Sequence, residues 1–164
     1  ELATRAEAFA SQPHVFVAPT GHPLVAQSQQ AHLLPEALAE QAFIMREAGS
    51  GTRASLERFC EMTAFSPQVV MEMSNNETIK QAVMAGMGLS FLSLHTIGLE
   101  LRHGLMAVVH VQGAPVMRDW NCVHTLAKVL SPAAEAFRQF MLARGEDFLA
   151  RQFGSLLAQD MDMP

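Results

Sequence analysis

Six short apolar runs, separated by segments with helical periodicity, constrain the fold of this chain most. They begin at residues 14, 43, 69, 89, 105 and 120 and read HVFVA, FIM, VVMEM, LSFLS, LMAVVHV and WNCVHT. Short runs rich in Val, Leu and Phe are typical of strands that are buried on both faces. Their alternation with helical segments predicts an α/β domain with a mostly parallel sheet and right-handed crossovers.

The segments between the runs carry the signals of helices. Leu56, Phe59 and Cys60 recur at helical spacing and predict one buried helix face. The pair Ser131-Pro132 is a strong helix start, and the apolar residues after it predict a last helix that extends to about residue 148. Residues 155–164, SLLAQDMDMP, read as a frayed tail.

A capping box opens another helix at residue 74. In the letters SNNE, the Ser74 hydroxyl would accept a hydrogen bond from the backbone N–H of Glu77, and the Glu77 carboxylate would accept one from the N–H of Ser74. Gly86 or Gly88 would end this helix, because glycine readily adopts the left-handed conformation found after helix ends.

Composition excludes several classes of function. An apolar content of 49% indicates a packed globular domain, and a formal charge of −5 gives no attraction to nucleic acid or to an anionic membrane. A DNA-binding surface would therefore lie outside this segment. No apolar run is long enough to span a bilayer. Cys60 and Cys122 both have apolar neighbours, which fits core positions in a reducing, cytoplasmic compartment. The chain lacks a leader-like start and an initial Met, so we expect a piece of a longer protein.

Two loops follow neighbouring apolar runs and are the best candidates for a binding site. Residues 49–53 follow FIM, and residues 74–78 follow VVMEM. In open α/β sheets, ligands collect at the carboxyl ends of the strands, where helix N-termini point outward. Both loops are expected at that edge. Their shared position is the most informative feature of the sequence, and it indicates a ligand-binding site.

The loop at residues 49–53 has the chemistry of an anion site. Its glycines allow close approach to the backbone, and the helix that follows presents free N–H groups with a partial positive charge. Arg53 could add a bidentate contact to a carboxylate or phosphate. The alternative is a plain strand-to-helix connection, capped by Ser50 or Thr52. A nucleotide P-loop does not fit, because the required lysine is absent.

The loop at residues 74–78 is more polar than a helix cap requires. Asn75 and Asn76 each offer a donor and an acceptor, which could recognise a hydroxylated small molecule. Equally, Ser74 and Glu77 could cap the helix while both asparagines face water. The residues leave these two interpretations open.

Neither catalysis nor metal binding is indicated. The seven histidines are scattered, with no pair at metal-ligand spacing. Glu47, Glu72 and Glu77 lie near the expected strand ends, but no paired carboxylates or Ser/Cys–His arrangement accompanies them. We therefore expect no catalytic residue, no metal and no cofactor.

The same segments carry a family resemblance. The runs VFVAPTGHPLV from residue 15, FIMREAGSGTRASLERF from residue 43 and MEMSNNETIKQAVMAGMGLSFLSLHT from residue 71 resemble the effector-binding domain of LysR-type transcriptional regulators. Among these, the chain looks most like the regulators of carbon-dioxide-fixation (Calvin cycle) operons. The resemblance extends from about residue 9 to residue 140, and its most specific motifs are REAGSGTR and SNNETIKQAVMAGMGL.

This resemblance implies a fold like that of type 2 periplasmic binding proteins, in which two α/β lobes are joined by two crossover strands. Residues 1–12 would form the end of the first lobe and the first crossover, and residues 13–125 the second lobe. Residues 126–150 would form the second crossover and the C-terminal helix of the first lobe, followed by a tail at 151–164. The family's N-terminal DNA-binding domain and most of the first lobe would lie outside the chain.

The resemblance also implies the function and its residues. A small anionic metabolite would bind between the lobes and control the geometry of a DNA-bound homodimer or homotetramer; DNA would be contacted only through the missing domain. The expected effector contacts are Ser50, Gly51, Thr52, Arg53, Ser74, Asn75, Asn76, Thr78 and Ser93. A solute-binding protein of a transport system on the same fold is the main alternative. An enzyme using an acid such as Glu77 is a third hypothesis.

Overall fold

The structure, a computed structural model, describes residues 3–161. Its strands are β1 (Thr4–Pro19), β2 (Ala42–Arg46), β3 (Gln68–Met73), β4 (Leu89–Ser93), β5 (Met106–Val109) and β6 (Val116–Thr125). Its α-helices are α1 (Pro23–Ser28), α2 (Gly51–Thr63), α3 (Asn76–Met84), α4 (Gly98–Arg102) and α5 (Pro132–Met161), with two short 3₁₀ turns, η1 (Pro35–Leu38) and η2 (Leu94–Thr96). Each of the six apolar runs contributes to a strand, as predicted.

One mixed sheet organises the domain. Its strand order is β3-β2-β4-β1-β5, and β6 pairs with β1. β2 is parallel to β3 and β4, whereas β1 is antiparallel to β4, β5 and β6. The prediction of a mostly parallel sheet is therefore wrong for the half built around β1. The physical reason is that an apolar run indicates burial but not the direction of the strand.

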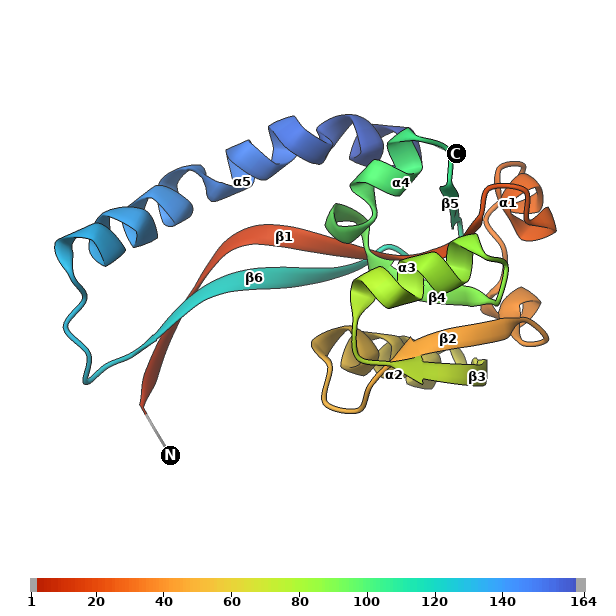
Figure 1. The fold of residues 1–164 in the computed structure, drawn as a ribbon, viewed down its shortest axis with the longest axis horizontal. Helices are drawn as coiled ribbons and strands as arrows, with labels where there is room; N and C mark the ends of the chain where they lie inside the picture. The colour runs from red at the N-terminus through yellow and green to blue at the C-terminus, as the bar shows by residue number, and fades with distance from the viewer. Residues whose placement is uncertain (1–2, 162–164) are drawn as a thin grey trace.

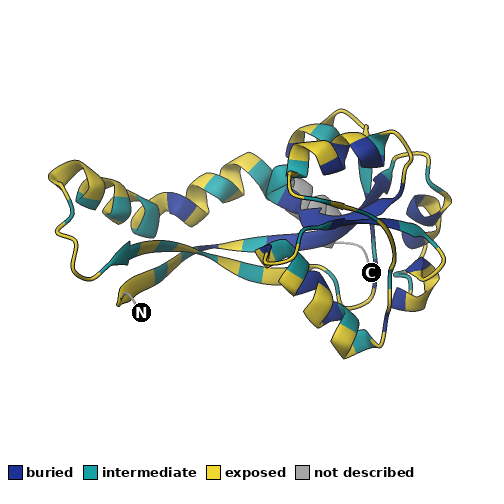
Figure 2. Cartoon of the chain, turned by 60° about the horizontal axis from the view of Figure 1, so that its bottom comes forward, coloured by how far each residue is buried: buried dark blue, intermediate teal, exposed yellow. Residues whose placement is uncertain are grey.

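The core lies on both faces of this sheet. α2 packs on one face through an aromatic cluster, in which the Phe16 ring meets Phe59 and Phe91 with centroids 5.1 Å apart. α3 packs on the other face, where Ile79 and Val83 are fully buried. In Figure 2 the buried residues accordingly concentrate where the helices flank the sheet. This sandwich holds the strand ends in fixed positions.

A long arm leaves this core. β1 and β6 pair antiparallel from Thr4↔Thr125 to His14↔Val116, and α5 runs beside them (Figure 1). The Arg138 Nε donates to Glu7 Oε2 at 2.8 Å, and Gly145 lets the Phe9 ring approach the helix, because a Cβ there would lie 2.7 Å from Phe9 Cδ2. Ion pairing and ring packing thus hold α5 against the arm.

One predicted boundary needs correction. The second long strand of the arm, β6, covers residues 116–125, and the assignment of residues 126–150 to a second crossover and a last helix stays a prediction. α5 begins at Pro132 as predicted, but it continues to Met161, where most of a tail was expected. No proline interrupts this stretch before residue 164, so the helix has no strong stop. Residues 162–164 of the expected tail lie outside the described residues. Between residues 3 and 161, no helix is both long and apolar enough to cross a membrane.

Candidate functional site

The two candidate loops lie side by side at one edge of the sheet. β2 and β3 are parallel neighbours with Arg46 opposite Met73, so the helices that follow them begin at the same edge. The Glu47 N–H donates to the Met73 carbonyl at 3.2 Å, and Arg46 Nη1 donates to Asn76 Oδ1 at 2.5 Å. The sequence prediction that these loops come together is therefore confirmed.

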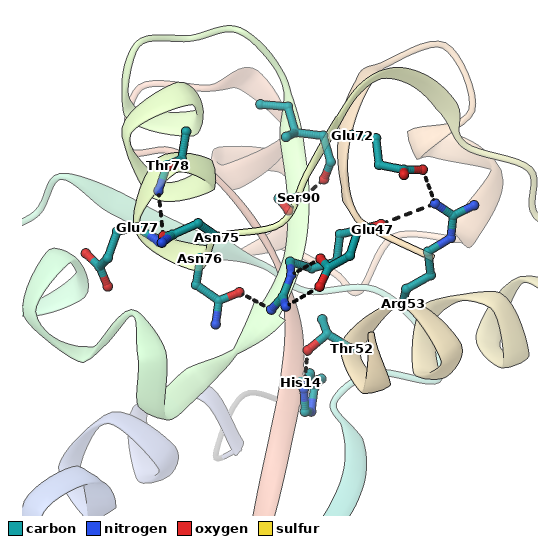
Figure 3. Close-up of polar contacts among 12 residues, drawn as sticks. His14, Glu47, Thr52, Arg53, Glu72, Asn75, Asn76, Glu77, Thr78 and Ser90 are labelled. Carbon is teal, nitrogen blue, oxygen red and sulfur yellow. Dashed lines mark hydrogen bonds and ion pairs between the residues drawn. The ribbon is translucent and has the colours of Figure 1, made fainter. Parts of the chain in front are cut away.

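Arg46 links the two loops through its partners Glu47 and Asn76, which Figure 3 labels. Its Nε donates to Glu47 Oε2 at 2.7 Å and its Nη2 donates to Glu47 Oε1 at 3.0 Å, a bidentate arrangement. These hydrogen bonds from Arg46 hold the pKa of the Glu47 carboxyl below its usual range. Arg46 thereby fixes the position of Asn76 at the start of α3.

Asn75, and not Ser74, caps α3. Asn75 Oδ1 accepts hydrogen bonds from the N–H groups of Glu77 at 2.7 Å and Thr78 at 3.3 Å. Ser74 is exposed and lies before this cap. The predicted capping box at Ser74 and Glu77 is therefore wrong. Both residue types cap helices well, and the backbone conformation selects Asn75.

Arg53 points away from the start of α2. Its Nε donates to Glu57 Oε1 at 2.8 Å, its Nη1 donates to the Arg46 carbonyl at 3.2 Å, and it also pairs with Glu72 on β3. In Figure 3 Arg53 and Glu72 point toward each other, apart from Thr52. The guanidinium that was expected to receive an anion is thus bound by two carboxylates.

Thr52 and Ser93 are instead brought together by a residue that the sequence analysis missed. His14 on β1 is 1% exposed, and its Nε2 lies 3.4 Å from Thr52 Oγ1 (Figure 3). Ser93 is the partner of His14 across the strands β1 and β4. The Ser93 hydroxyl is buried and has no hydrogen-bond partner among the described residues. The only signal in the sequence was a polar residue opening an apolar run.

Burial keeps His14 neutral. Removal from water lowers the pKa of its imidazole to about 4, although the hydrogen bond to the Gln12 carbonyl acts in the opposite direction. The positive charge of Arg118 and the nearby His95 lower this pKa further. At neutral pH the ring can therefore act as one donor and one acceptor.

Arg118 is the second residue that the sequence analysis missed. Its guanidinium lies against Gly51, the first residue of α2, where an added Cβ would be 2.7 Å from Nη1 and 2.8 Å from Nη2. Gly51 therefore serves to admit this side chain. Arg118 belongs to β6, far along the sequence from α2, and no local pattern could have related the two.

Comparisons with known proteins agree with this architecture. The family model described as the LysR substrate binding domain matches residues 3–146. The transcriptional regulator CfxR of Cupriavidus necator is 45% identical over 96% of this chain, and the RuBisCO operon transcriptional regulator of Allochromatium vinosum is 47% identical over 84%. The chain spans 49% and 45% of the lengths of these two relatives, so it corresponds to about half of each.

A solved structure supports the same assignment. The Synechocystis PCC6803 CcmR regulatory domain in complex with 2-PG superposes with a TM-score of 0.79 at 33% identity, covering 87% of this chain and 67% of that one. The expected type 2 periplasmic-binding-protein-like fold is confirmed, as is the resemblance to regulators of carbon dioxide fixation. The chain belongs to the LysR family, whose substrate binding domain its residues 3–146 match.

Proposed function

We propose that this chain is the effector-sensing part of a cytoplasmic transcriptional regulator of carbon-dioxide-fixation genes, and that it binds a small anionic metabolite without catalysing a reaction. One observation carries the proposal: the N-termini of α2 and α3 meet at the carboxyl ends of parallel strands. The partial positive charge at both helix N-termini and the N–H groups of α2, which no side chain caps, favour a negatively charged ligand there. The complex of the CcmR regulatory domain with 2-PG supports a small metabolite as the ligand class.

The effector would act by favouring one arrangement of the whole protein. We propose that it bridges this lobe and a second lobe outside the chain, and that the relative position of the lobes sets the spacing of the DNA-binding domains in a homodimer or homotetramer. Such a shift requires that the effector binds one arrangement more tightly than the other. DNA contacts would belong to the part of the protein beyond this chain.

We propose that two copies of the protein pair through a surface formed by α2 and β3. β3 is an edge strand of the sheet, and its Val69 and Val70 side chains are each 46% exposed. Met62 on α2 is 78% exposed. An open strand edge with apolar side chains favours association with a second copy. This supports a homo-oligomer.

Two measurements on the full-length protein test the proposal. The first is calorimetric titration with anionic metabolites, 2-PG among them, and the second is footprinting on its operator DNA.

Thr52→Val removes the hydroxyl beside His14 at almost constant volume. We expect it to weaken effector binding by about 1–3 kcal/mol, the cost of an unpaired polar partner. The same change at Thr63, whose hydroxyl donates to the Phe59 carbonyl at the far end of α2, is the matched control.

The proposal fails if no anionic metabolite in the panel both binds and alters the footprint. Equal effector affinities of Thr52→Val and Thr63→Val would contradict the proposed position of the site.

A further inference from the structure

Arg118 lies in an electrostatically unfavourable place. Its guanidinium covers the N-terminus of α2, a 13-residue helix whose first turn holds no acidic residue. The N-cap residue Ser50 makes no side-chain capping hydrogen bond. A full positive charge thus meets the positive end of a helix dipole, and among the described side chains, those of residues 3–154, Arg118 forms no ion pair. An anion between them would convert this repulsion into two attractions.

A buried hydroxyl faces the same space. Ser93 is 4% exposed, and its Oγ has no partner among the described residues. Residues two apart on a strand share a face, so Ser93 lies on the same face of the sheet as Phe91, which packs in the cluster under α2. Its cross-strand partner His14 stacks on Phe91 and touches Thr52 in the first turn of α2. The unpaired hydroxyl therefore points to the side where α2 begins.

The alternation of side chains along β6 also directs Arg118 toward the start of α2. Val116 is paired with His14 and packs against the cluster under α2, and Arg118 is two residues further along β6. Its side chain therefore leaves the sheet on the α2 face. Three strands, β1, β4 and β6, thus each supply one polar side chain around the start of α2, although these residues are far apart in the sequence.

We propose that Arg118, the N–H groups at the start of α2 and the Ser93 hydroxyl together clamp the oxyanion of the effector, a phosphate or a carboxylate. This inference rests on the proposed function and names the cation that selects the ligand. A planar guanidinium gives two parallel hydrogen bonds to such a group, and the helix N–H groups supply the donors on its other side. Arg53 has no part in the clamp.

The test is calorimetry on the full-length protein with three probes: inorganic phosphate, 3-phosphoglycerate and glycerate. Arg118→Met should weaken binding of the anion roughly ten- to hundredfold, as expected for a lost charge-assisted hydrogen bond. Arg118→Lys should restore part of the affinity, because the charge stays while the fork is lost. Arg58→Met, an exposed arginine on the same helix, removes the same charge and should leave the affinity unchanged.

Gly51→Ala separates the clamp from a general effect of charge. It removes no charge, but its Cβ would displace the Arg118 guanidinium. We expect it to weaken anion binding as Arg118→Met does, with a thermal unfolding midpoint close to that of the unchanged protein. Arg118-dependent binding of phosphate and 3-phosphoglycerate identifies a phosphate clamp, and Arg118-dependent binding of glycerate identifies a carboxylate clamp.

Anion affinity that is equal in the unchanged protein, Arg118→Met and Gly51→Ala overturns the inference, as does the absence of binding of all three probes. The proposed function would survive either result if another metabolite still altered the DNA footprint. Conversely, Arg118-dependent binding without any effect on DNA would support the clamp and reject the regulator.

Discussion

At the scale of single residues, the polar side chains at the sheet edge fall into two groups. Arg46, Arg53 and Asn75 are occupied by partners inside the domain. Ser93 and Arg118 have no such partners among the described residues and lie around the start of α2. Residue type alone does not separate the groups, because an arginine belongs to each. The partner that each side chain meets makes the difference.

His14 should make stability depend on pH. The folded protein keeps its pKa at about 4, below the value of 6.5 in an unfolded chain, so the unfolded state binds more protons between these values. The contribution is fully present above pH 6.5 and is lost as the pH falls toward 4. Its upper limit is about 3 kcal/mol, from 1.36 kcal/mol for each pKa unit.

Urea unfolding of the unchanged protein and of His14→Phe, measured between pH 7 and pH 4, checks this prediction. The variant should lose less stability over that range, since a phenyl ring does not titrate. Equal losses in both proteins would mean that His14 does not titrate differently in the folded and unfolded states.

At the scale of secondary-structure elements, helix N-termini give the site its preference for anions. α2 and α3 start on adjacent parallel strands, and α3 is closed by the Asn75 side chain, whereas the start of α2 is not capped by a side chain. The free N–H groups of α2 are consequently the ones available to a ligand. We therefore expect α2 to bind the anion and α3 to support the loop beside it.

Asn75→Ala should lower the free energy of unfolding by about 1 kcal/mol, because two N–H groups of α3 lose their acceptor. Ser74→Ala, which changes the exposed neighbour outside the cap, should have little effect. Denaturant midpoints of the two variants at constant slope measure the difference. A larger loss from Ser74→Ala would restore the capping box expected from the sequence.

At the scale of the whole molecule, the packed core and the long arm differ in burial and therefore in local stability. β1 passes from the exposed arm into the centre of the sheet, and Figure 2 shows the change from exposed to buried residues along it. Between the arm and α5 lies an apolar groove of about 290 Å³, lined by aromatic residues that include Phe9, Trp120 and Phe140. We propose that the remainder of the first lobe covers this surface in the full-length protein.

Hydrogen exchange should reveal this division. Amides at residues 4–8 of β1 are expected to exchange by local opening at lower free energy than those at residues 15–17, which are almost fully buried. In the full-length protein, protection at residues 4–8 should rise while that at residues 15–17 stays the same. Mass spectrometry of exchanged peptides measures both, and uniform protection along β1 would argue against a separate arm.

Much of this architecture is local and therefore readable from the sequence. Apolar runs fix which residues must leave water, so they located every strand, and the small polar residues after two of them located the loops that begin α2 and α3. Ser131-Pro132 likewise placed the start of α5. These signals act within a few residues, through burial, capping and backbone preference.

Contacts between distant residues depend instead on how the whole chain packs. The packing of β1 between β4 and β5 set its antiparallel direction, the Glu72 carboxylate drew Arg53 away from the loop, and β6 placed Arg118 against Gly51. Burial depends on the character of each residue, whereas ion pairing depends on which side chains the folded chain brings together. Local residue preferences thus specify the two loops of the site, whereas the packing of distant strands specifies which arginine lies over them.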